Sequence, residues 1–514
     1  MAAQPPTLCS DRFLILVPVW IPSFFFPTID WCTAGTIYPR AAHAHSIVSL
    51  QRMESLPDDV LLEVMQYVAV PDLFACRLVC KRFLDLVQHG DVWRLRQLDE
   101  TDPWMCTVLR LAPCLEEMRL ALPLKRCHTP FTTKCAVADL ALDFRDSDTP
   151  LDAVQAAFVI RHQAALGRLK RIEVSYLELP YFEWAVLSGT LASTAGLEAL
   201  QLDVRVIGSP APAPVLHGAV STASLEAFFC ILVPELEPFC RCILTVHSAT
   251  LHVVTLNDHW RDQRHYSTTT ATWLAPRLAG MPNLTHLQCT LLPGMEALAT
   301  CSSLRSVRID VQSNAPELIR GAAAFLRHAT QLRQVCLLCI NPSIHPLSDV
   351  GKDLVVALAS SGKSRVMQLS ISYPNKNSDA DFSAQPPVEA LSSLPVLESL
   401  SITGLPEEVL PGISPTTTPA LRTLAICPVE PPKGCAHAWM HSDAVRAVLS
   451  LNPLLHIKLS FSKGSCQGEL CQWCSMGCHR DMWGFKRIAV FSHDPSVKCL
   501  QNHSDDRFWI HVSH

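Results

Sequence analysis

The chain has 514 residues, of which 49% are hydrophobic, so it carries enough apolar side chains for packed domains and is not disordered throughout. Its formal net charge is -5, with 42 Lys and Arg against 47 Asp and Glu, which provides no basic field for nucleic-acid phosphates. Glycine is scarce at 19 residues, and the glycine-based phosphate and hydrolase motifs and the HExxH metal motif do not occur. Nucleic acid is therefore excluded as the main partner, and the common enzyme signatures are missing.

Residues 1–52 are predicted to be a poorly structured apolar extension. No charged residue occurs from Phe13 to Ile29, but three prolines interrupt this run, and proline opposes a helix long enough to span a membrane. Small residues at a distance suitable for signal-peptide cleavage are also missing. Met53 directly precedes the first well-patterned segment and is a candidate start codon, which leaves open whether the extension belongs to the main product.

Three short helices are predicted between residues 53 and 98. Ser55 is a candidate N-cap for the first helix, whose Leu61 and Val64 then share one face. Asp72 is expected to cap the second helix, and Gly90 to end the third. Three helices of this length bury little apolar surface by themselves. The segment is therefore expected to need a partner.

The residue order in this segment closely resembles the F-box, the adaptor-binding module of SCF ubiquitin ligases. The resemblance is carried by Leu-Pro-Asp-Asp-Val-Leu at 56–61, Pro-Asp-Leu at 71–73 and Arg-Phe at 82–83. Phe83 stands where many members carry tryptophan, and Asp58 where many carry glutamate. The resemblance implies that seven residues bind the adaptor or hold the helices together: Leu56, Pro57, Leu61, Val64, Leu73, Val79 and Phe83. The alternative is a helical cap on the next domain.

Residues 99–462 contain a recurring hexapeptide, leucine-x-x-apolar-x-apolar. Alternation on a strand turns its fourth and sixth positions inward and its fifth outward, while the first leucine packs between strand and helix. Helices are predicted between the strands at 151–166, 316–329 and 349–360, and the first has Leu151, Val154, Phe158 and Ala165 on one side. The copies begin at Leu169, Leu197, Leu225, Leu251, Leu284, Leu304, Leu332, Val366, Leu397, Leu421 and Leu454.

The mean interval of about 28 residues resembles that of leucine-rich repeats. The predicted fold class is therefore α/β, with a small helical F-box module followed by a curved leucine-rich-repeat solenoid. Arg205 and Gln312 stand where the repeat family usually has Asn or Cys, so the family's asparagine hydrogen bonds are not expected. Outward fifth positions are candidates for substrate binding, with a solvated polar face as the alternative: Glu173, Gln201, Gln288, Arg308, Ser401 and Lys458.

The chain has 22 cysteines, most of which are predicted to be small buried apolar residues rather than a disulfide framework. Those assigned to apolar positions are Cys76, Cys80, Cys230 and Cys289. Cys336 and Cys339 are expected on opposite faces of one strand. The group at Cys466, Cys471, Cys474, Cys478 and His479 has residue types that bind zinc, but its spacing is incomplete, and no metal or cofactor is predicted. Residues 463–514 are expected to form a tail or a cap rich in Cys and aromatic residues.

These patterns predict a non-catalytic, cytoplasmic or nuclear substrate-recognition subunit of an SCF-type E3 ubiquitin ligase. Its F-box would bind the adaptor, and through it the cullin and RING subunits, while the repeats bind an unknown protein target. The alternative is a secreted or membrane-attached leucine-rich-repeat recognition protein, favoured by the apolar N-terminus and by sequons at Asn283 and Asn502. A third reading is a scaffold that binds the adaptor without delivering targets for degradation.

Overall fold

The fold is described from a computed structural model of the chain. The chain divides into two units, Met1–Leu56 and Pro57–His514, and every helix and strand below lies in the second. The predicted extension, the cysteine group at 466–479 and Asn502 fall outside the residues that the structure describes. Those residues are 56–124, 127–144, 152–207, 222–257, 271–311, 315–339, 348–372, 388–403, 409–427, 439–460, 476, 487–493 and 509–512.

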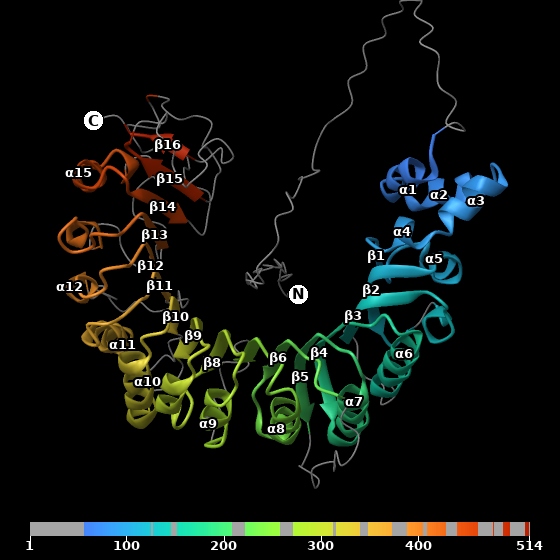
Figure 1. Cartoon of the computed structure of the whole chain (residues 1–514), viewed down its shortest axis with the longest axis horizontal. Coiled ribbons are helices and arrows are strands. Elements are labelled where there is room, and N and C mark those ends of the chain that lie inside the picture. Colours follow the sequence, from blue (N-terminus) through green and yellow to red (C-terminus); the bar gives the residue numbers. More distant parts are fainter. Residues whose placement is uncertain are drawn as a thin grey trace, which may run out of the picture. The chain divides into compact units, whose positions relative to one another are not determined.

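The second unit is mixed α/β and is built on a 16-stranded sheet whose spatial order follows the sequence (Figure 1). Neighbouring strands are parallel except β14 and β15, which are antiparallel. The strands are β1 Gln97–Asp99, β2 Cys114–Leu122, β3 Ala136–Phe144, β4 Arg171–Pro180, β5 Ala199–Ile207, β6 Ala227–Ile231, β7 Val253–Asn257, β8 His286–Thr290, β9 Ser306–Val311, β10 Gln334–Cys339, β11 Gln368–Ser372, β12 Ser399–Thr403, β13 Thr423–Cys427, β14 His456–Ser460, β15 Arg487–Phe491 and β16 Trp509–His511.

Each of the eleven hexapeptides coincides with a strand, from β4 to β14, and each strand begins two residues after the first hexapeptide residue. All fourth and sixth positions are buried, as Leu400 and Ile402 are in β12. Fourth positions pair with fourth positions throughout, for example Leu287 with Val307. The last copy differs at its first residue, because Leu454 is 48% exposed and the adjacent Leu455 is buried in its place.

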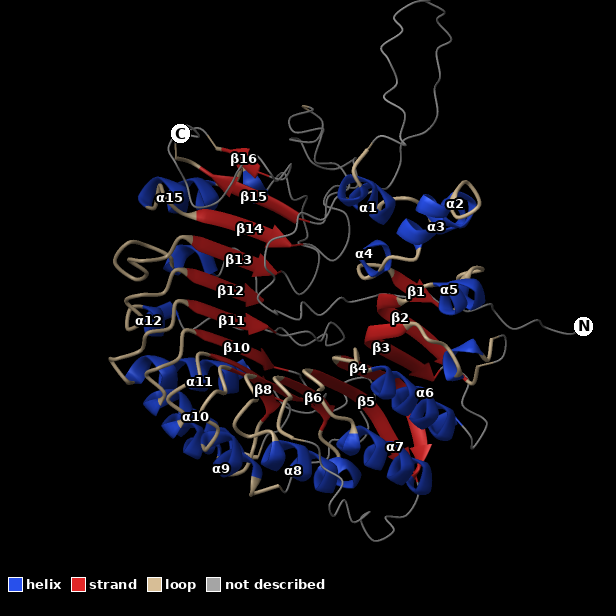
Figure 2. Cartoon of the chain, turned by 45° about the vertical axis from the view of Figure 1, so that its right-hand side comes forward, coloured by secondary structure: helices blue, strands red, loops and turns tan. Residues whose placement is uncertain are grey.

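Helices fill the connections that parallel strands require, and α6 to α11 lie along one face of the sheet (Figure 2). The three helices predicted between strands are present as α6, α10 and α11. The helices are α1 Asp58–Gln66, α2 Val70–Cys76, α3 Lys81–Val87, α4 Gly90–Trp93, α5 Met105–Leu111, α6 Asp152–Leu166, α7 Tyr181–Ser193, α8 Glu237–Val246, α9 Leu274–Ala279, α10 Pro316–His328, α11 Ser348–Ser360, α12 Val388–Leu391 and α15 Asp443–Leu451, with 3-10 turns η2 Thr129–Phe131, η3 Pro234–Leu236, η4 Met295–Thr300 and η5 Leu410–Gly412.

The predicted buried side of α6 is wrong. Phe158 is 62% exposed, whereas Ala153, Ala156 and Ile160 are buried. The two stripes are offset around the helix, and the one with small alanines faces β2 and β3, where α6 makes its sheet contacts. Alanine at these positions allows a helix to approach a sheet closely, so the bulkier stripe with Phe158 is left on the solvent side.

The three short N-terminal helices exist, but their predicted ends differ. Helix α1 begins at Asp58 with Pro57 as N-cap residue, and Ser55 lies outside the described part of the chain. Asp72 lies in the first turn of α2, whose N-cap residue is Ala69. Gly90 does not end α3 but begins α4.

The C-terminal tail extends the sheet. Strand β15 pairs with β14, and β16 pairs with β15. Phe491 and Trp509 lie against the His456 ring, with centroid distances of 6.3 and 5.3 Å. These two aromatic residues therefore cover part of β14, while Trp473, Trp483 and Phe485 lie outside the described residues. No helix in the described ranges is long and apolar enough to cross a membrane.

Most of the described cysteines form no disulfide, while Cys106 and Cys127 are bonded to each other. Cys230 and Cys289 are buried as predicted. Cys80 is exposed and Cys76 half-buried. The prediction that both lie on an apolar face is therefore wrong for Cys80, which is the N-cap residue of α3 and precedes the helix. The predicted opposite orientation of the β10 pair holds, since Cys336 is half-buried and Cys339 buried.

Candidate functional site: an exposed apolar surface on the N-terminal helices

The helices α1 to α4 pack around a small apolar core. Leu61, Met65 and Leu73 are at most 3% exposed, and α1 packs against α3 and α4 while α2 packs against α3. The indole N–H of Trp93 donates to the Val87 carbonyl at 2.6 Å, which fixes α4 to the end of α3. Leu61 and Leu73, two of the seven predicted residues, therefore hold the helices together and are not available to a partner.

Arg96 ties the end of α1 to the start of the sheet. Its Nη2 donates to the carbonyl oxygens of Met65, Gln66 and Val68 at 2.8, 3.0 and 2.7 Å, and its Nε donates to that of Val92 at 2.8 Å. The last carbonyls of a helix have no partner within the helix, and the planar guanidinium reaches several of them at once. Burial lowers the pKa of Arg96 from its ordinary value.

An ion pair joins the N-terminus of α1 to α3. The Arg82 guanidinium contacts Asp58 Oδ1 at 2.6 Å through Nη2 and donates to it through Nε at 2.8 Å. Asp58 lies in the first turn of α1, where a negative charge is favoured by the helix dipole. Phe83, the neighbour of Arg82 and one of the seven predicted residues, is half-buried on α3.

The same segment leaves large apolar side chains in solvent. Val64 is 45% and Val79 68% exposed, so these two predicted residues are accessible, as is Pro57, while Leu56 is half-buried. Exposed apolar surface of this density marks an interaction site. The exposed large apolar residues of the segment are Val60, Val64, Tyr67, Leu78, Val79 and Leu95.

Residues 53–96 match the F-box-like family model. The match supports an adaptor-binding role for this segment in a ubiquitin ligase. No curated protein matches the chain significantly. The other predicted domain boundaries remain predictions.

Sequence reasoning missed the two most exposed apolar residues and the main polar anchor. Leu78 and Tyr67 are 87% and 83% exposed, and both stand beside apolar residues that the pattern had assigned to the segment. Arg96 carries no local signal, because its role depends on carbonyl oxygens about 30 residues earlier in the chain.

The structure places all six predicted substrate-binding residues in one row. Glu173 pairs with Gln201 across β4 and β5, and Gln288 with Arg308 across β8 and β9. Ser401 on β12 and Lys458 on β14 continue this row, because both pair with Ala425 on β13, the strand between them. We refer to these paired residues as the fifth-position row; every one of the six is half-buried.

Most charges in the fifth-position row are already engaged within the chain. Arg308 lies 3.2 Å from Asp310 and Gln288 also bonds to that carboxylate. Glu173 accepts from Ser175 Oγ at 3.1 Å and from Gln201 Nε2 at 3.4 Å. These contacts orient the side chains on the face of the sheet that the helices do not cover.

Lys458 contacts an aromatic ring, and burial raises the pKa values of one acid and one thiol. Lys458 Nζ lies 5.1 Å from the Trp509 ring centroid, a cation–π contact. Burial raises the pKa of Asp310 despite its arginine partner. It also raises the pKa of the Cys135 thiol to about 12, which keeps this thiol protonated and therefore a poor nucleophile. Within the described ranges, no group of three or more His, Cys, Asp or Glu is arranged to hold a metal ion.

Proposed function

We propose that this chain is a substrate-recognition subunit of an SCF-type E3 ubiquitin ligase. The observation that carries the proposal is the F-box-like match at residues 53–96 together with the exposed Val64, Leu78 and Val79 on the same segment. Apolar side chains that remain in solvent in a folded segment gain free energy when a partner covers them. The SCF adaptor is the partner that this match supports, and cullin and RING subunits follow through it.

The second half of the proposal concerns the sheet and its helices. We propose that they form a leucine-rich-repeat solenoid, cytoplasmic or nuclear, and that the face bearing the fifth-position row binds a protein target. The support is the burial of every fourth and sixth hexapeptide residue and the strand-by-strand pairing of the fifth positions. Stacked units of this kind leave an extended surface for protein binding.

In this proposal the chain makes and breaks no bond. It holds the target beside the ubiquitin-charged enzyme that the RING subunit recruits, so the reaction profits from a raised local concentration. The buried, protonated thiol of Cys135 agrees with a chain that contributes no cysteine nucleophile at that position.

Adaptor binding is tested by purifying the full chain from cells and probing for the adaptor and the cullin. Val64→Asp combined with Val79→Asp places charges on exposed positions, so we expect the fold to persist and adaptor recovery to fall about tenfold or more. Val356→Asp is the matched control, because Val356 lies on α11 and is also 45% exposed. Absence of adaptor and cullin from the wild-type preparation, or equal recovery with the double variant, contradicts the proposal.

Target binding is tested separately, with the proteasome inhibited to retain targets. Proteins that copurify with the chain and accumulate when it is depleted are the candidates. Ser401→Trp puts a bulky side chain on the fifth-position row and is expected to release them while the adaptor stays bound. If targets bind this variant as well as the wild type, the row is not the binding surface; if no protein accumulates on depletion, the chain is a scaffold.

A further inference from the structure

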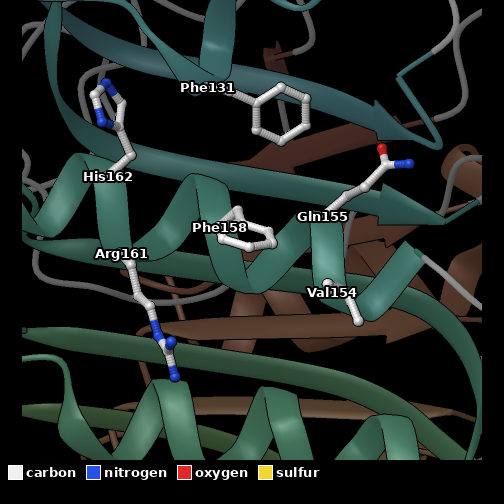
Figure 3. A pocket seen from close by; sticks show the side chains of 6 residues that line it. All are labelled: Phe131, Val154, Gln155, Phe158, Arg161 and His162. Carbon is white, nitrogen blue, oxygen red and sulfur yellow. The ribbon is translucent and has the colours of Figure 1, made fainter.

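A pocket of about 590 Å³ lies on α6, on the side away from the sheet. It is lined by Phe131 of η2 and by five residues of α6, shown in Figure 3. Phe131 and Phe158 present their rings to the same open space, and Gln155 and His162 stand at its two ends. The lining residues are Phe131, Val154, Gln155, Phe158, Arg161 and His162.

Two of the α6 residues of the pocket, Val154 and Phe158, form a second apolar stripe on that helix. Val154 and Phe158 are one turn apart, the spacing that normally marks a buried helix face. The opposite stripe, with Ala156 and Ile160, already packs against the sheet. The Phe158 ring is therefore 62% exposed and takes no part in the packing of α6 on the sheet. A stripe of this kind on the outer side of a packed helix favours an external partner.

The walls of the pocket are held in place by contacts within the chain. The Phe131 ring stacks on His128 with a centroid distance of 6.4 Å, and the adjacent Cys127 is bonded to Cys106 of α5. His162 donates from Nε2 to the Thr133 carbonyl at 2.7 Å, since a carbonyl oxygen only accepts. A pre-formed site of this kind spends little binding free energy on ordering itself.

The polar groups at the pocket select for acceptors. The lining contains no Asp or Glu, and Arg161 has no hydrogen bond or ion pair with another described residue. Gln155 Oε1 already accepts from the Leu124 N–H at 3.2 Å, which leaves its amide N–H groups as donors. Arg161 lies on the other side of the Phe158 ring from Phe131, and the Gln155 amide lies at one end of the pocket (Figure 3). These donors around the Phe158 ring complement an apolar side chain that has a carboxylate next to it.

The shape favours a peptide over a small molecule. From Val154 to His162 the lining extends over two helical turns, about 12 Å. The pocket is open along this length, whereas sites for small molecules enclose most of the ligand surface. We propose that the α6 pocket binds a peptide segment of a partner protein in which a bulky apolar side chain stands beside a carboxylate. The site lies on the helix-covered side of the sheet, so it goes beyond the proposed adaptor and target surfaces.

The probe for this site is a random peptide display library selected on the full chain. We expect the enriched peptides to share a Phe, Trp, Leu or Met adjacent to Asp or Glu. A labelled enriched peptide, followed by fluorescence anisotropy, is expected to lose affinity about tenfold or more with Phe158→Ser. Phe182→Ser is the matched control, since Phe182 on the neighbouring α7 is 61% exposed and does not line the pocket.

Charge reversal and self-association complete the test. Selection on Arg161→Glu is expected to shift the enriched peptides from acidic to basic. Enrichment without acidic residues, equal binding to the Phe158→Ser variant, or an equal loss with Phe182→Ser overturns the proposal. Sedimentation shows whether a second copy occupies the site instead: a dimer that becomes monomeric with Phe158→Ser also overturns it. Adaptor recovery is expected to stay unchanged in these variants, so failure here leaves the proposed function standing.

Discussion

Leu400 in β12 and Leu78 in the turn between α2 and α3 are the same residue type in opposite surroundings, with 1% and 87% of their surface exposed. The difference extends to their regions. From β4 to β14, the fourth and sixth hexapeptide positions are all buried. The apolar side chains at these positions therefore lie in the core and are not available to a partner. The segment from α1 to α3 buries Leu61, Leu73 and Leu86 and leaves Val64, Leu78 and Val79 in solvent.

The comparison shows that apolar content has two different uses in one chain. In the sheet, each strand and helix donates side chains to a core shared with its neighbours, which a single unit lacks. The core of the N-terminal helices is small, so polar contacts from Arg82 and Arg96 supply part of the stability of this segment. Apolar residues such as Val79 are thereby left for a partner.

The sharpest way to break this comparison is to truncate both leucines. Leu400→Ala is expected to lower the free energy of unfolding by about 2–5 kcal/mol, because it removes buried methyl groups and leaves a cavity. Leu78→Ala is expected to change it by no more than about 0.5 kcal/mol. Urea unfolding followed by circular dichroism measures both. Similar losses for the two variants mean that the exposed leucine is part of a core.

The role of polar contacts in the N-terminal helices is tested at Arg96. Arg96→Gln removes a charged group that donates to four carbonyl oxygens, so the expected loss in stability is about 1.5–3 kcal/mol. Arg96→Lys keeps the charge but not the planar fork and is expected to recover only part of this. Hydrogen exchange of the α1 amides locates the effect. Unchanged protection of α1 in the Gln variant contradicts the anchoring role.

On the uncovered face of the sheet, the comparison is sharpened at the Arg308–Asp310 pair. Arg308→Gln leaves the buried Asp310 carboxylate without its cation, which is expected to cost about 1–3 kcal/mol. Adding Asp310→Asn removes that charge, so the double variant is expected to be more stable than Arg308→Gln alone. Thermal unfolding of the two single variants and the double variant gives the coupling. Additive effects mean that the ion pair is not a structural contact.

The smallest expected effect is a pH dependence at His247, the C-cap residue of α8. Its Nδ1 accepts from the backbone N–H groups of Ser224 and Leu225, each at 3.2 Å, and burial lowers its pKa from the ordinary 6.5. The unfolded chain therefore binds the proton first. The contribution of the neutral ring is complete above pH 6.5 and is lost as the pH falls through the folded pKa.

His247→Asn keeps an acceptor but does not titrate. The thermal midpoint of the wild type is expected to fall more than that of this variant between about pH 7.5 and about pH 5.5. Equal shifts in both proteins assign the pH dependence to other groups.

The strands were predictable from sequence because each hexapeptide obeys a local rule, alternation on a strand beside a helix. The face of α6 was not, because Val154 and Phe158 have the spacing of a core stripe and only the sheet decides which stripe it contacts. Strands β15 and β16 carry no repeat pattern and depend on pairing with β14. The polar anchor Arg96 was invisible for a similar reason, since its acceptors belong to another helix.

The two ends of the sheet have a consequence for the behaviour of the chain in solution. A parallel sheet exposes unpaired N–H and C=O groups along both edge strands, which invites other chains to add further strands. Here both edge strands, β1 and β16, are only three residues long, and α4 packs beside β1's neighbour β2. Short edges offer few hydrogen bonds to an incoming strand, so end-to-end growth of copies into a fibril is disfavoured.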